Sequence, residues 1–253
     1  MKALITGASS GIGLDIARYL ATKGYELILV ARSKEKLEYI QSKMPTKTTI
    51  VVMDLSNEQK VKELCVLMKN ENIDMLVNNA GFGNFGEFSE TELSKDMEMI
   101  NTNIKAVHIL TKFALKNMIK KDYGYILNVA SSAGFMPGGP LLSTYYATKS
   151  YVLSLTEAIN YELKKKKSNV IVSALCPGPV DTNFNNVANV TFKTKALSSK
   201  FVAKYAIDEI LENKKLIIIP GRKMKLAKFF SRFLSDKALL RITYKIQRKK
   251  LTK

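Results

Sequence analysis

The sequence predicts an α/β fold built on a doubly wound parallel sheet of about seven strands in a single domain. Short apolar runs alternate with amphipathic stretches of helical period along the first 220 residues. The runs are apolar at consecutive positions, which is typical of strands covered by helices on both faces. Right-handed crossovers between such units then give a doubly wound sheet.

Each predicted element follows from a local pattern. We expect strands at 2–6, 26–31, 49–53, 73–77, 124–129, 169–175 and 215–219. Amphipathic helices are expected near 12–23, 33–43, 57–70, 101–121, 146–165 and 197–213. No internal repeat or low-complexity linker interrupts this alternation, so residues 1–220 are expected to form one domain.

The composition excludes several classes of protein. No stretch reaches the roughly 18 consecutive apolar residues of a membrane span, and a strand beginning at Lys2 leaves no room for a signal peptide. The only cysteines, Cys65 and Cys176, have apolar neighbours and are expected to be buried free thiols of a cytoplasmic protein. The single histidine, His108, lies in an apolar pattern, so the sequence predicts no metal site and no histidine-based catalysis.

A glycine-rich turn at Thr6–Gly13 follows the first predicted strand and precedes a helix. Its spacing is Gly-x-x-x-Gly-x-Gly. Glycines let the backbone approach a pyrophosphate, while the helix N-terminus directs free N–H groups at the anion. The turn therefore predicts nucleotide binding in a Rossmann-type fold.

Tyr145 and Lys149 are four residues apart and would share one face of a helix. An ordinary phenol has a pKa of about 10 and is a poor acid at neutral pH. A neighbouring ammonium group favours the phenolate and lowers that pKa. The pair is thus a candidate for proton transfer.

These features together resemble the short-chain dehydrogenase/reductase family over about 220 residues. Further matching segments are Asp54 after the third strand, Asn78-Asn79-Ala80-Gly81 after the fourth, and Pro177-Gly178 followed by Thr182. The resemblance identifies residues 1–220 as the cofactor-binding catalytic domain. It implies these cofactor contacts: Gly7, Ser9, Ser10, Gly11, Ile12, Gly13, Arg32, Asp54, Leu55, Asn79, Ala80, Gly81, Tyr145, Lys149, Pro177, Gly178, Val180 and Thr182.

The resemblance also implies a catalytic set of Asn103, a serine, Tyr145 and Lys149. Tyr145 would protonate a carbonyl oxygen, and Lys149 would lower the tyrosine pKa and hold the nicotinamide ribose. The serine would hydrogen-bond the substrate oxygen as charge develops on it. Asn103 would support a water relay behind the lysine, or else bond only to backbone.

Two adjacent serines, Ser131 and Ser132, compete for the catalytic role. In relatives the active serine usually stands three residues after the strand asparagine, here Asn128, which favours Ser131. The usual separation of thirteen residues from the catalytic tyrosine, here Tyr145, favours Ser132. Because loops accept insertions more readily than strand ends, we choose Ser131.

The residues that close the second strand predict the choice of cofactor. Ala31 stands where an acid would bond a free ribose 2′-hydroxyl. Arg32 follows it, and a guanidinium suits a 2′-phosphate. The prediction is NADP(H) in preference to NAD(H).

Residues 221–253 form a basic extension. Twelve basic residues face one acid, Asp236, so this tail carries +11 of the total charge of +18. Residues 222–234 hold an apolar stripe of Leu226, Phe229, Phe230 and Phe233, and a second helix capped by Ser235 or Asp236 would carry Leu239, Leu240, Ile242 and Ile246. The stripes would pack on the body or on another subunit, lie on an anionic membrane surface, or meet an acidic partner such as an acyl carrier protein or a nucleic acid.

The polar segment 182–200 has no clear period and is interpreted as a substrate lid or a plain surface loop. The sequence as a whole predicts an NADP(H)-dependent oxidoreductase that interconverts a carbonyl and a secondary alcohol, with a ketone, 3-oxoacyl or hydroxysteroid-like substrate. The alternatives are a non-enzymatic NADP(H) sensor or scaffold and a membrane-surface lipid reductase. By the resemblance we expect a homodimer or homotetramer, and no base-reading feature indicates a specific nucleic acid partner.

Overall fold

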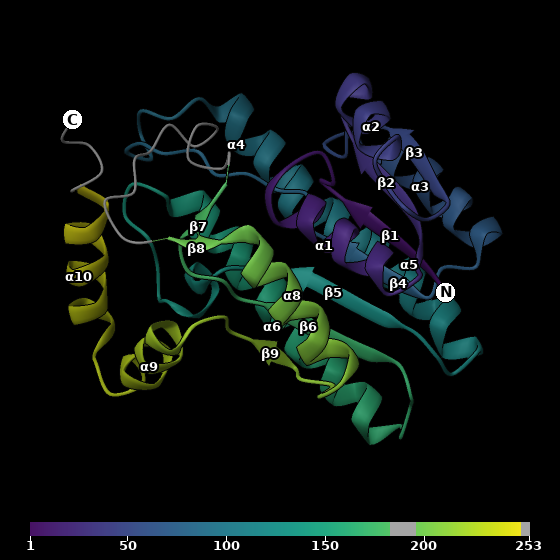
Figure 1. The fold of residues 1–253 in the computed structure, drawn as a ribbon. Coiled ribbons are helices and arrows are strands. Elements are labelled where there is room, and N and C mark those ends of the chain that lie inside the picture. Colours follow the sequence, from purple (N-terminus) through teal and green to yellow (C-terminus); the bar gives the residue numbers. More distant parts are fainter. Residues whose placement is uncertain (183–195, 249–253) are drawn as a thin grey trace.

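The computed structural model describes residues 1–182 and 196–248 of the chain. Its main sheet contains seven parallel strands in the order β3-β2-β1-β4-β5-β6-β9 (Figure 1). The strands are β1 (Lys2–Thr6), β2 (Glu26–Ala31), β3 (Thr48–Val52), β4 (Met75–Asn78), β5 (Tyr125–Val129), β6 (Ile171–Leu175) and β9 (Ile217–Ile218). This order reverses direction between β1 and β4, so the predicted doubly wound parallel sheet is confirmed.

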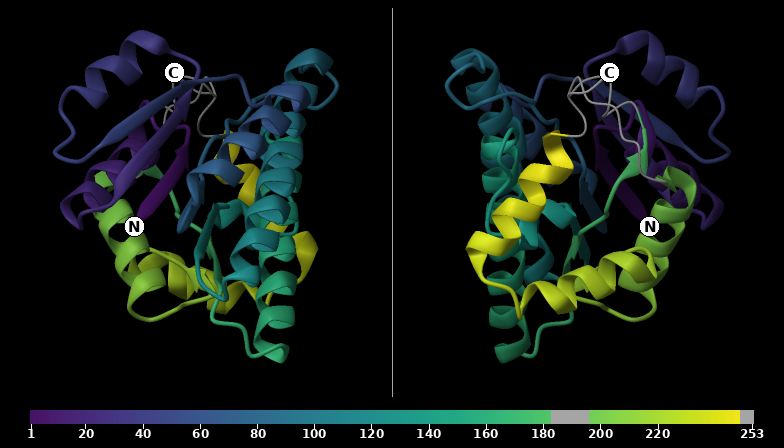
Figure 2. Two further views of the ribbon diagram at one scale, coloured as in Figure 1. Left: turned by 90° about the vertical axis from the view of Figure 1, so that its right-hand side faces the viewer. Right: turned by 90° about the vertical axis from the view of Figure 1, so that its left-hand side faces the viewer.

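Helices cover both faces of this sheet, as the two side views show (Figure 2). They are α1 (Gly11–Thr22), α2 (Lys34–Gln41), α3 (Glu58–Glu71), α4 (Leu93–Ile100), α5 (Val107–Lys120), α6 (Ser143–Lys165) and α8 (Ser199–Leu211). A 3₁₀ turn, η2 (Ser132–Phe135), follows β5, and a short parallel pair joins β7 (Val180–Asp181) to β8 (Leu197–Ser198). Except for the helix expected at 101–121, the predicted helices form within three residues of their expected bounds.

Strand residues alternate between two cores. Ala3 and Ile5 of β1 join the core beneath α1, α2 and α8, whereas Leu4 between them joins the core beneath α3, α5 and α6. Because successive side chains of a strand point to opposite faces, a strand buried on both sides must be apolar throughout. Burial on both faces therefore explains why each strand appears in the sequence as a run of consecutive apolar residues. Cys65 and Cys176 are both buried free thiols, as expected.

The helix before β5 begins earlier than the sequence suggested. We expected a start near residue 101, but α4 begins at Leu93 and runs through a π-helical segment, η1 (Asn101–Ala106), into α5. Such π segments insert an extra residue per turn and shift the faces of a helix, which interrupts a regular apolar period. The apolar period in the sequence therefore predicted only the second half of the continuous helix formed by α4, η1 and α5.

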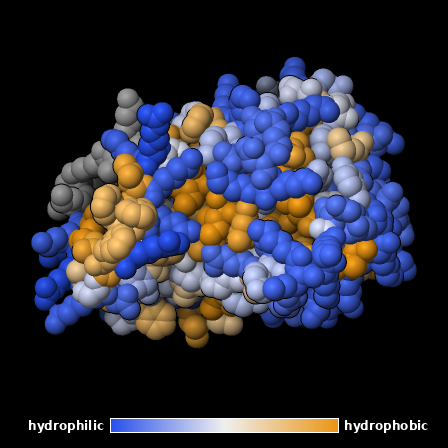
Figure 3. Space-filling view, turned by 90° about the horizontal axis from the view of Figure 1, so that it is seen from below, coloured by the Kyte–Doolittle hydropathy of each residue, from blue (hydrophilic) through white to orange (hydrophobic). Residues whose placement is uncertain are grey.

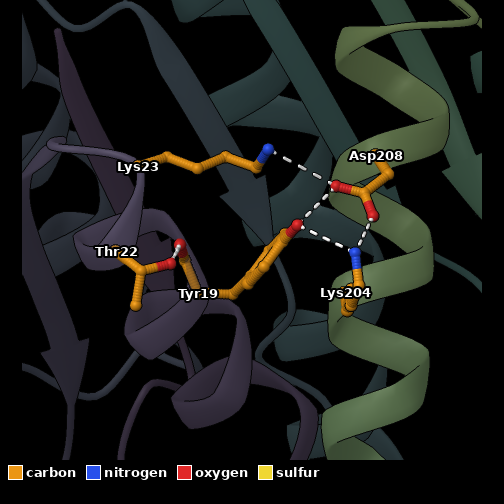
Figure 4. A network of polar contacts seen from close by, with 5 residues as sticks. All are labelled: Tyr19, Thr22, Lys23, Lys204 and Asp208. Atoms are coloured by element: carbon orange, nitrogen blue, oxygen red, sulfur yellow. Dashed lines mark hydrogen bonds and ion pairs between the residues drawn. The ribbon is translucent and has the colours of Figure 1, made fainter.

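Helix α1 is held against α8 by a polar network (Figure 4). The Tyr19 hydroxyl donates to Asp208 Oδ1 at 2.6 Å, and Lys204 Nζ lies 2.7 Å from Asp208 Oδ2. Lys23 Nζ lies 3.5 Å from the same carboxylate. These contacts fix the helix that follows the glycine turn against the helix that follows the segment 183–195. That segment, which holds most of the predicted lid, lies outside the described residues.

The basic tail folds as two helices, α9 (Arg222–Ser231) and α10 (Asp236–Arg248), at one end of the molecule (Figure 1). The body of this chain buries no residue of α9, and whether another subunit, a membrane surface or an acidic partner covers that helix stays a prediction. In α10 the buried side chains are Leu239, Thr243 and Gln247, whereas Leu240, Ile242 and Ile246 are exposed. Side chains on the inner sides of both helices stay accessible because they face a cavity.

Within the two described ranges, no helix combines the length and the apolar character needed to cross a bilayer.

Candidate active site

A cavity of about 1490 Å³ lies at the carboxyl edge of the main sheet. Its wall includes residues that close six strands or follow them within two positions, namely Gly7, Ala31, Asp54, Asn79, Ala130 and Pro177. Pro220, two residues beyond β9, adds to the same wall. The carboxyl ends of parallel strands meet at one edge, and the reversal of strand order there opens a crevice.

This wall brings together nearly all the residues that the sequence singled out. Of the predicted cofactor contacts, all except Gly11 and Gly13 line the cavity. Ser131, Tyr145 and Lys149 of the predicted catalytic set line it too, and so does Ser132. Asn103 does not.

The glycine turn has the geometry of an anion cradle. Gly11 adopts a φ of +55°, in the left-handed region, and a β-carbon at Gly13 would lie 2.3 Å from Asn79 Nδ2. Ser10, at the N-cap of α1, makes no side-chain capping bond, and the first turn holds no acid. The free N–H groups and positive dipole end of α1 therefore adjoin a cavity that accepts a phosphate group, so these residues fit a dinucleotide.

Asn79 and Thr6 brace that turn against β4. Asn79 Nδ2 donates to the carbonyl oxygens of Thr6 and Gly7 at 3.0 and 3.1 Å. The Thr6 hydroxyl accepts from the backbone N–H groups of Asn79 and Ala80 at 2.9 and 3.0 Å. The turn is thus held in place by hydrogen bonds from a neighbouring strand end.

Tyr145 and Lys149 lie on consecutive turns of α6, as their spacing predicted. Lys149 Nζ is 5.8 Å from the centre of the Tyr145 ring and donates to the Val129 carbonyl oxygen at 2.8 Å. Burial raises the pKa of Tyr145 to about 12, and a hydrogen bond with Ser131 opposes that rise. Burial lowers the pKa of Lys149 to about 8.

These directions differ from the expectation that Lys149 lowers the tyrosine pKa. Desolvation disfavours the charged form of each group and is the largest influence on both pKa values. The lysine head faces the Val129 carbonyl oxygen and the aromatic ring of Tyr145. Ser131 hydrogen-bonds the phenol group of Tyr145, and that bond lowers the tyrosine pKa.

The two candidate serines differ in their contacts. Ser131 caps the 3₁₀ turn, since its hydroxyl accepts from the Ala133 N–H at 3.1 Å, and it also bonds to Tyr145. Ser132 contributes a backbone N–H to the Pro177 carbonyl oxygen at 2.8 Å. The contact with Tyr145 favours Ser131 as the serine that acts with the tyrosine.

Asn103 lies behind the cavity wall in the π-helical segment and is fully buried. Its Nδ2 donates to the Phe82 carbonyl oxygen at 2.9 Å and to Thr148 Oγ1 at 3.1 Å. Its Oδ1 accepts from the Phe82 N–H at 3.1 Å. Both amide donors are therefore engaged, and Asn103 joins the loop after β4 to α6; its place in a water relay stays a prediction.

At the far end of the cavity, charged residues surround the end of β2. Arg32 lines the wall, and its Nη1 lies 3.1 Å from Glu98 Oε1 of α4. Lys36 lines the wall one helical turn further on, and Ser33 caps α2 by accepting from the Lys36 N–H. Sequence reasoning missed Lys36, although its spacing from Arg32 was visible, and it missed Glu98, for which no local signal exists.

The opposite end of the cavity is largely apolar and includes the tail. Gly178 approaches α9 so closely that a β-carbon there would lie 2.6 Å from the sulfur of Met224. Sequence reasoning did not assign the tail to a binding site. The apolar side chains at this end are Phe135, Met136, Leu142, Tyr146, Met224, Ala227, Phe230, Leu234, Leu239, Ile242 and Ile246.

Comparisons with known proteins agree with this geometry. Residues 1–191 match the family model described as short chain dehydrogenase. The chain is 32% identical to a 3-oxoacyl-[acyl-carrier-protein] reductase FabG of Rickettsia prowazekii, over 81% of this chain and 83% of that protein. It is 34% identical to hydroxysteroid dehydrogenase-like protein 1 of Gallus gallus, over 82% of this chain but only 65% of that protein's length.

Among solved structures, a short-chain dehydrogenase from Sphingobium yanoikuyae in complex with NADPH superimposes with a TM-score of 0.82. It shares 25% sequence identity, and the match covers 92% of this chain and 93% of that one.

Proposed function

The chain belongs to the short-chain dehydrogenase family, and from that premise we propose that it is an NADPH-dependent reductase of bulky apolar ketones. Its relatives identify it as a nicotinamide-dependent dehydrogenase or reductase acting on carbonyl or CH–OH groups. The preference for NADPH, the role of each site residue and the substrate class belong to the proposal.

The observation that carries the proposal is the position of Ser131, Tyr145 and Lys149 between two unlike ends of one cavity. The glycine turn and Arg32 line one end, and apolar side chains line the other. A bound nicotinamide cofactor supplies or accepts a hydride at this point. A ketone held at the apolar end would present its carbonyl oxygen to the tyrosine.

Tyr145 is then the proton donor to the carbonyl oxygen. A pKa near 12 keeps the phenol protonated at neutral pH, as an acid requires. The Ser131 hydroxyl hydrogen-bonds the developing negative charge on the same oxygen. Lys149, with a pKa near 8, stays largely charged at neutral pH and supports the developing phenolate.

Arg32 and Lys36 support the choice of NADPH over NADH. Two cations at the end of β2 favour a 2′-phosphate, and no acid closes that strand. Glu98 weakens this preference for a 2′-phosphate, because its carboxylate pairs with the Arg32 guanidinium.

The apolar end supports a substrate with a large hydrocarbon part. The names of the two curated relatives point to a 3-oxoacyl chain and a steroid, both of which carry a bulky apolar group beside an oxygen function. We also propose that residues 221–253 complete the substrate site of the 1–220 domain, since α9 and α10 line it. A homodimer or homotetramer and a cytoplasmic location stay predictions.

The decisive experiment compares Tyr145→Phe with Tyr146→Phe in full-length protein, using NADPH and a panel of long-chain ketones, 3-oxoacyl thioesters and steroid ketones. Tyr145→Phe should abolish turnover while NADPH still binds, as followed by quenching or shift of nicotinamide fluorescence. Tyr146→Phe should retain turnover. Normal activity of Tyr145→Phe, or equal loss in both variants, would refute the assigned proton donor.

A further inference from the structure

The two tail helices present an outward surface that the cavity does not use. On α9 this surface is an apolar stripe of Leu226, Phe229 and Phe233, none of which lines the cavity. On α10 it is a basic stripe of Lys237, Arg241, Lys245 and Arg248. Figure 3 shows the resulting mixture, with orange and light-orange side chains beside blue ones at the end of the molecule where these helices lie.

The apolar stripe is unusually open. Leu226, Phe229 and Phe233 are 55%, 53% and 72% exposed. The rings of Phe229 and Phe233 meet edge to face at 5.3 Å, so they form one continuous apolar surface and are not isolated side chains. Scattered exposed apolar residues are ordinary, but a contiguous aromatic patch marks a surface that another apolar phase covers.

The basic stripe recurs along α10 at helical spacing, opposite the buried side chains Leu239, Thr243 and Gln247. Its four members are exposed. Among the described residues, no lysine or arginine of α9 or α10 forms an ion pair, although the body holds thirteen such pairs. This charge is uncompensated within the described chain.

We propose that α9 and α10 dock this protein on the surface of an anionic lipid bilayer. The apolar stripe would enter the region between headgroups and acyl chains, while the basic stripe and the flanking residues Lys225 and Arg232 would lie among the anionic headgroups. Long lysine and arginine stems let the charged ends reach water while the helix lies in the interface. This proposal concerns the outward face of the tail and stands independently of the proposed reaction.

Charge favours a bilayer over the other occupants. A net charge of +11 in the tail repels a second copy that approaches with the same surface. An acidic protein would satisfy the basic stripe but would have to bury three large apolar side chains as well. A bilayer of anionic lipids supplies negative charge and an apolar interior together.

Docking in this orientation would set the cavity beside the membrane. The inner sides of the same two helices, including Met224, Phe230 and Ile246, form part of the apolar cavity wall. An apolar substrate dissolved in the bilayer would then lie close to the apolar end of the site.

The test is co-sedimentation of the full chain with vesicles of phosphatidylglycerol and phosphatidylcholine, compared with vesicles of phosphatidylcholine alone. We expect binding to the anionic vesicles, weakening as salt is raised, and little binding to the neutral ones. Phe229→Ser/Phe233→Ser should weaken binding at least about tenfold. Lys237→Glu/Arg241→Glu should weaken it by about tenfold or more.

Matched controls separate this surface from general basicity. Tyr39→Ser removes an exposed aromatic ring from α2, and Lys43→Glu/Lys47→Glu makes the same charge change on the body. Both controls should bind vesicles like the parent, and all variants should retain NADPH binding, which reports that they fold. The proposal is overturned if the parent does not bind anionic vesicles, if the body charge reversal weakens binding as much as the tail reversal, or if the Phe229→Ser/Phe233→Ser variant binds normally.

Discussion

Gln247 of α10 donates from Nε2 to the phenol oxygen of Tyr146 at 2.9 Å, joining two residues that are 101 positions apart. Tyr146 adjoins the proposed proton donor Tyr145 on α6, and Gln247 is buried. The tail is therefore tied by a partly buried polar contact to the helix that carries the proposed catalytic residues. Its position over the cavity is a property of the folded chain.

This contact leads to a prediction for Gln247→Ala. Loss of the hydrogen bond should lower the free energy of unfolding by about 1 kcal/mol and raise KM for a bulky ketone, with NADPH affinity unchanged. Urea denaturation of Gln247→Ala, Tyr146→Phe and the double variant measures the coupling. We expect a coupling energy near 1 kcal/mol; strict additivity would mean that the two side chains do not interact.

A second prediction separates the adjacent serines. Ser131→Ala removes the hydrogen bond to Tyr145 and should lower kcat by about 10²- to 10³-fold. Ser132→Ala keeps its backbone bond to Pro177 and should change kcat little. The alkaline limb of the pH–rate profile should also move upward in Ser131→Ala, because the bond to Ser131 opposes the rise of the Tyr145 pKa. The reverse order of the two kcat values would move the catalytic role to Ser132.

A third prediction concerns cofactor choice. Arg32→Ala should weaken NADPH binding by about tenfold or more while NADH binding changes little. Glu98→Gln frees the guanidinium from its carboxylate partner and should strengthen NADPH binding. Lys36→Ala should resemble Arg32→Ala with a smaller effect. Dissociation constants for both cofactors provide the measurement, and equal losses for NADPH and NADH in Arg32→Ala would contradict the assignment.

A fourth prediction addresses the contact between α1 and α8. Asp208→Asn weakens the network of Tyr19, Lys23 and Lys204 and should lower stability by about 1 kcal/mol. The pKa of Asp208 is lowered despite burial, because Lys204 and Tyr19 bond its carboxylate. Its contribution is thus present above the unfolded pKa of about 3.9 and is lost as pH falls through the folded value. The difference in unfolding free energy between parent and Asp208→Asn should shrink below about pH 4. Glu212→Gln, at the exposed C-cap of α8, is the control.

The fold was largely predictable because its signals are local. The strand bounds 2–6 and 26–31 follow from apolar runs that are buried on both faces. The glycine turn follows from a backbone conformation that few other residues adopt. By contrast, Arg32 and Glu98 pair across 66 positions of the sequence and belong to different elements. The residues beside each of them in the sequence do not indicate this pairing.

The tail shows where periodicity stops being informative. The stripe of Leu226, Phe229, Phe230 and Phe233 correctly predicted a helix, but an apolar stripe carries no information on what covers it. In the structure Leu226, Phe229 and Phe233 lie outside the cavity wall, whereas Phe230 of the same stripe lines the cavity together with Met224 and Ala227. The side of α9 that faces the cavity depends on the position at which the chain leaves β9, and the tertiary structure sets that position.

The last prediction uses the buried charge of Lys149 in protein without cofactor. Its pKa falls from 10.5 to about 8 on folding because burial disfavours the ammonium form. Between those values the unfolded chain binds more protons than the folded one, so the free energy of unfolding rises with pH across this window. The penalty is fully present below about pH 8 and amounts to at most about 3 kcal/mol. Lys149→Met removes it and should be more stable than the parent at pH 7. That advantage should disappear by about pH 10, where the parent keeps its bond to the Val129 carbonyl oxygen. Urea denaturation at several pH values provides the measurement, with exposed Lys164→Met as the control. A stability difference between Lys149→Met and parent that does not vary with pH would contradict this prediction, because it would show that Lys149 folds with an ordinary pKa.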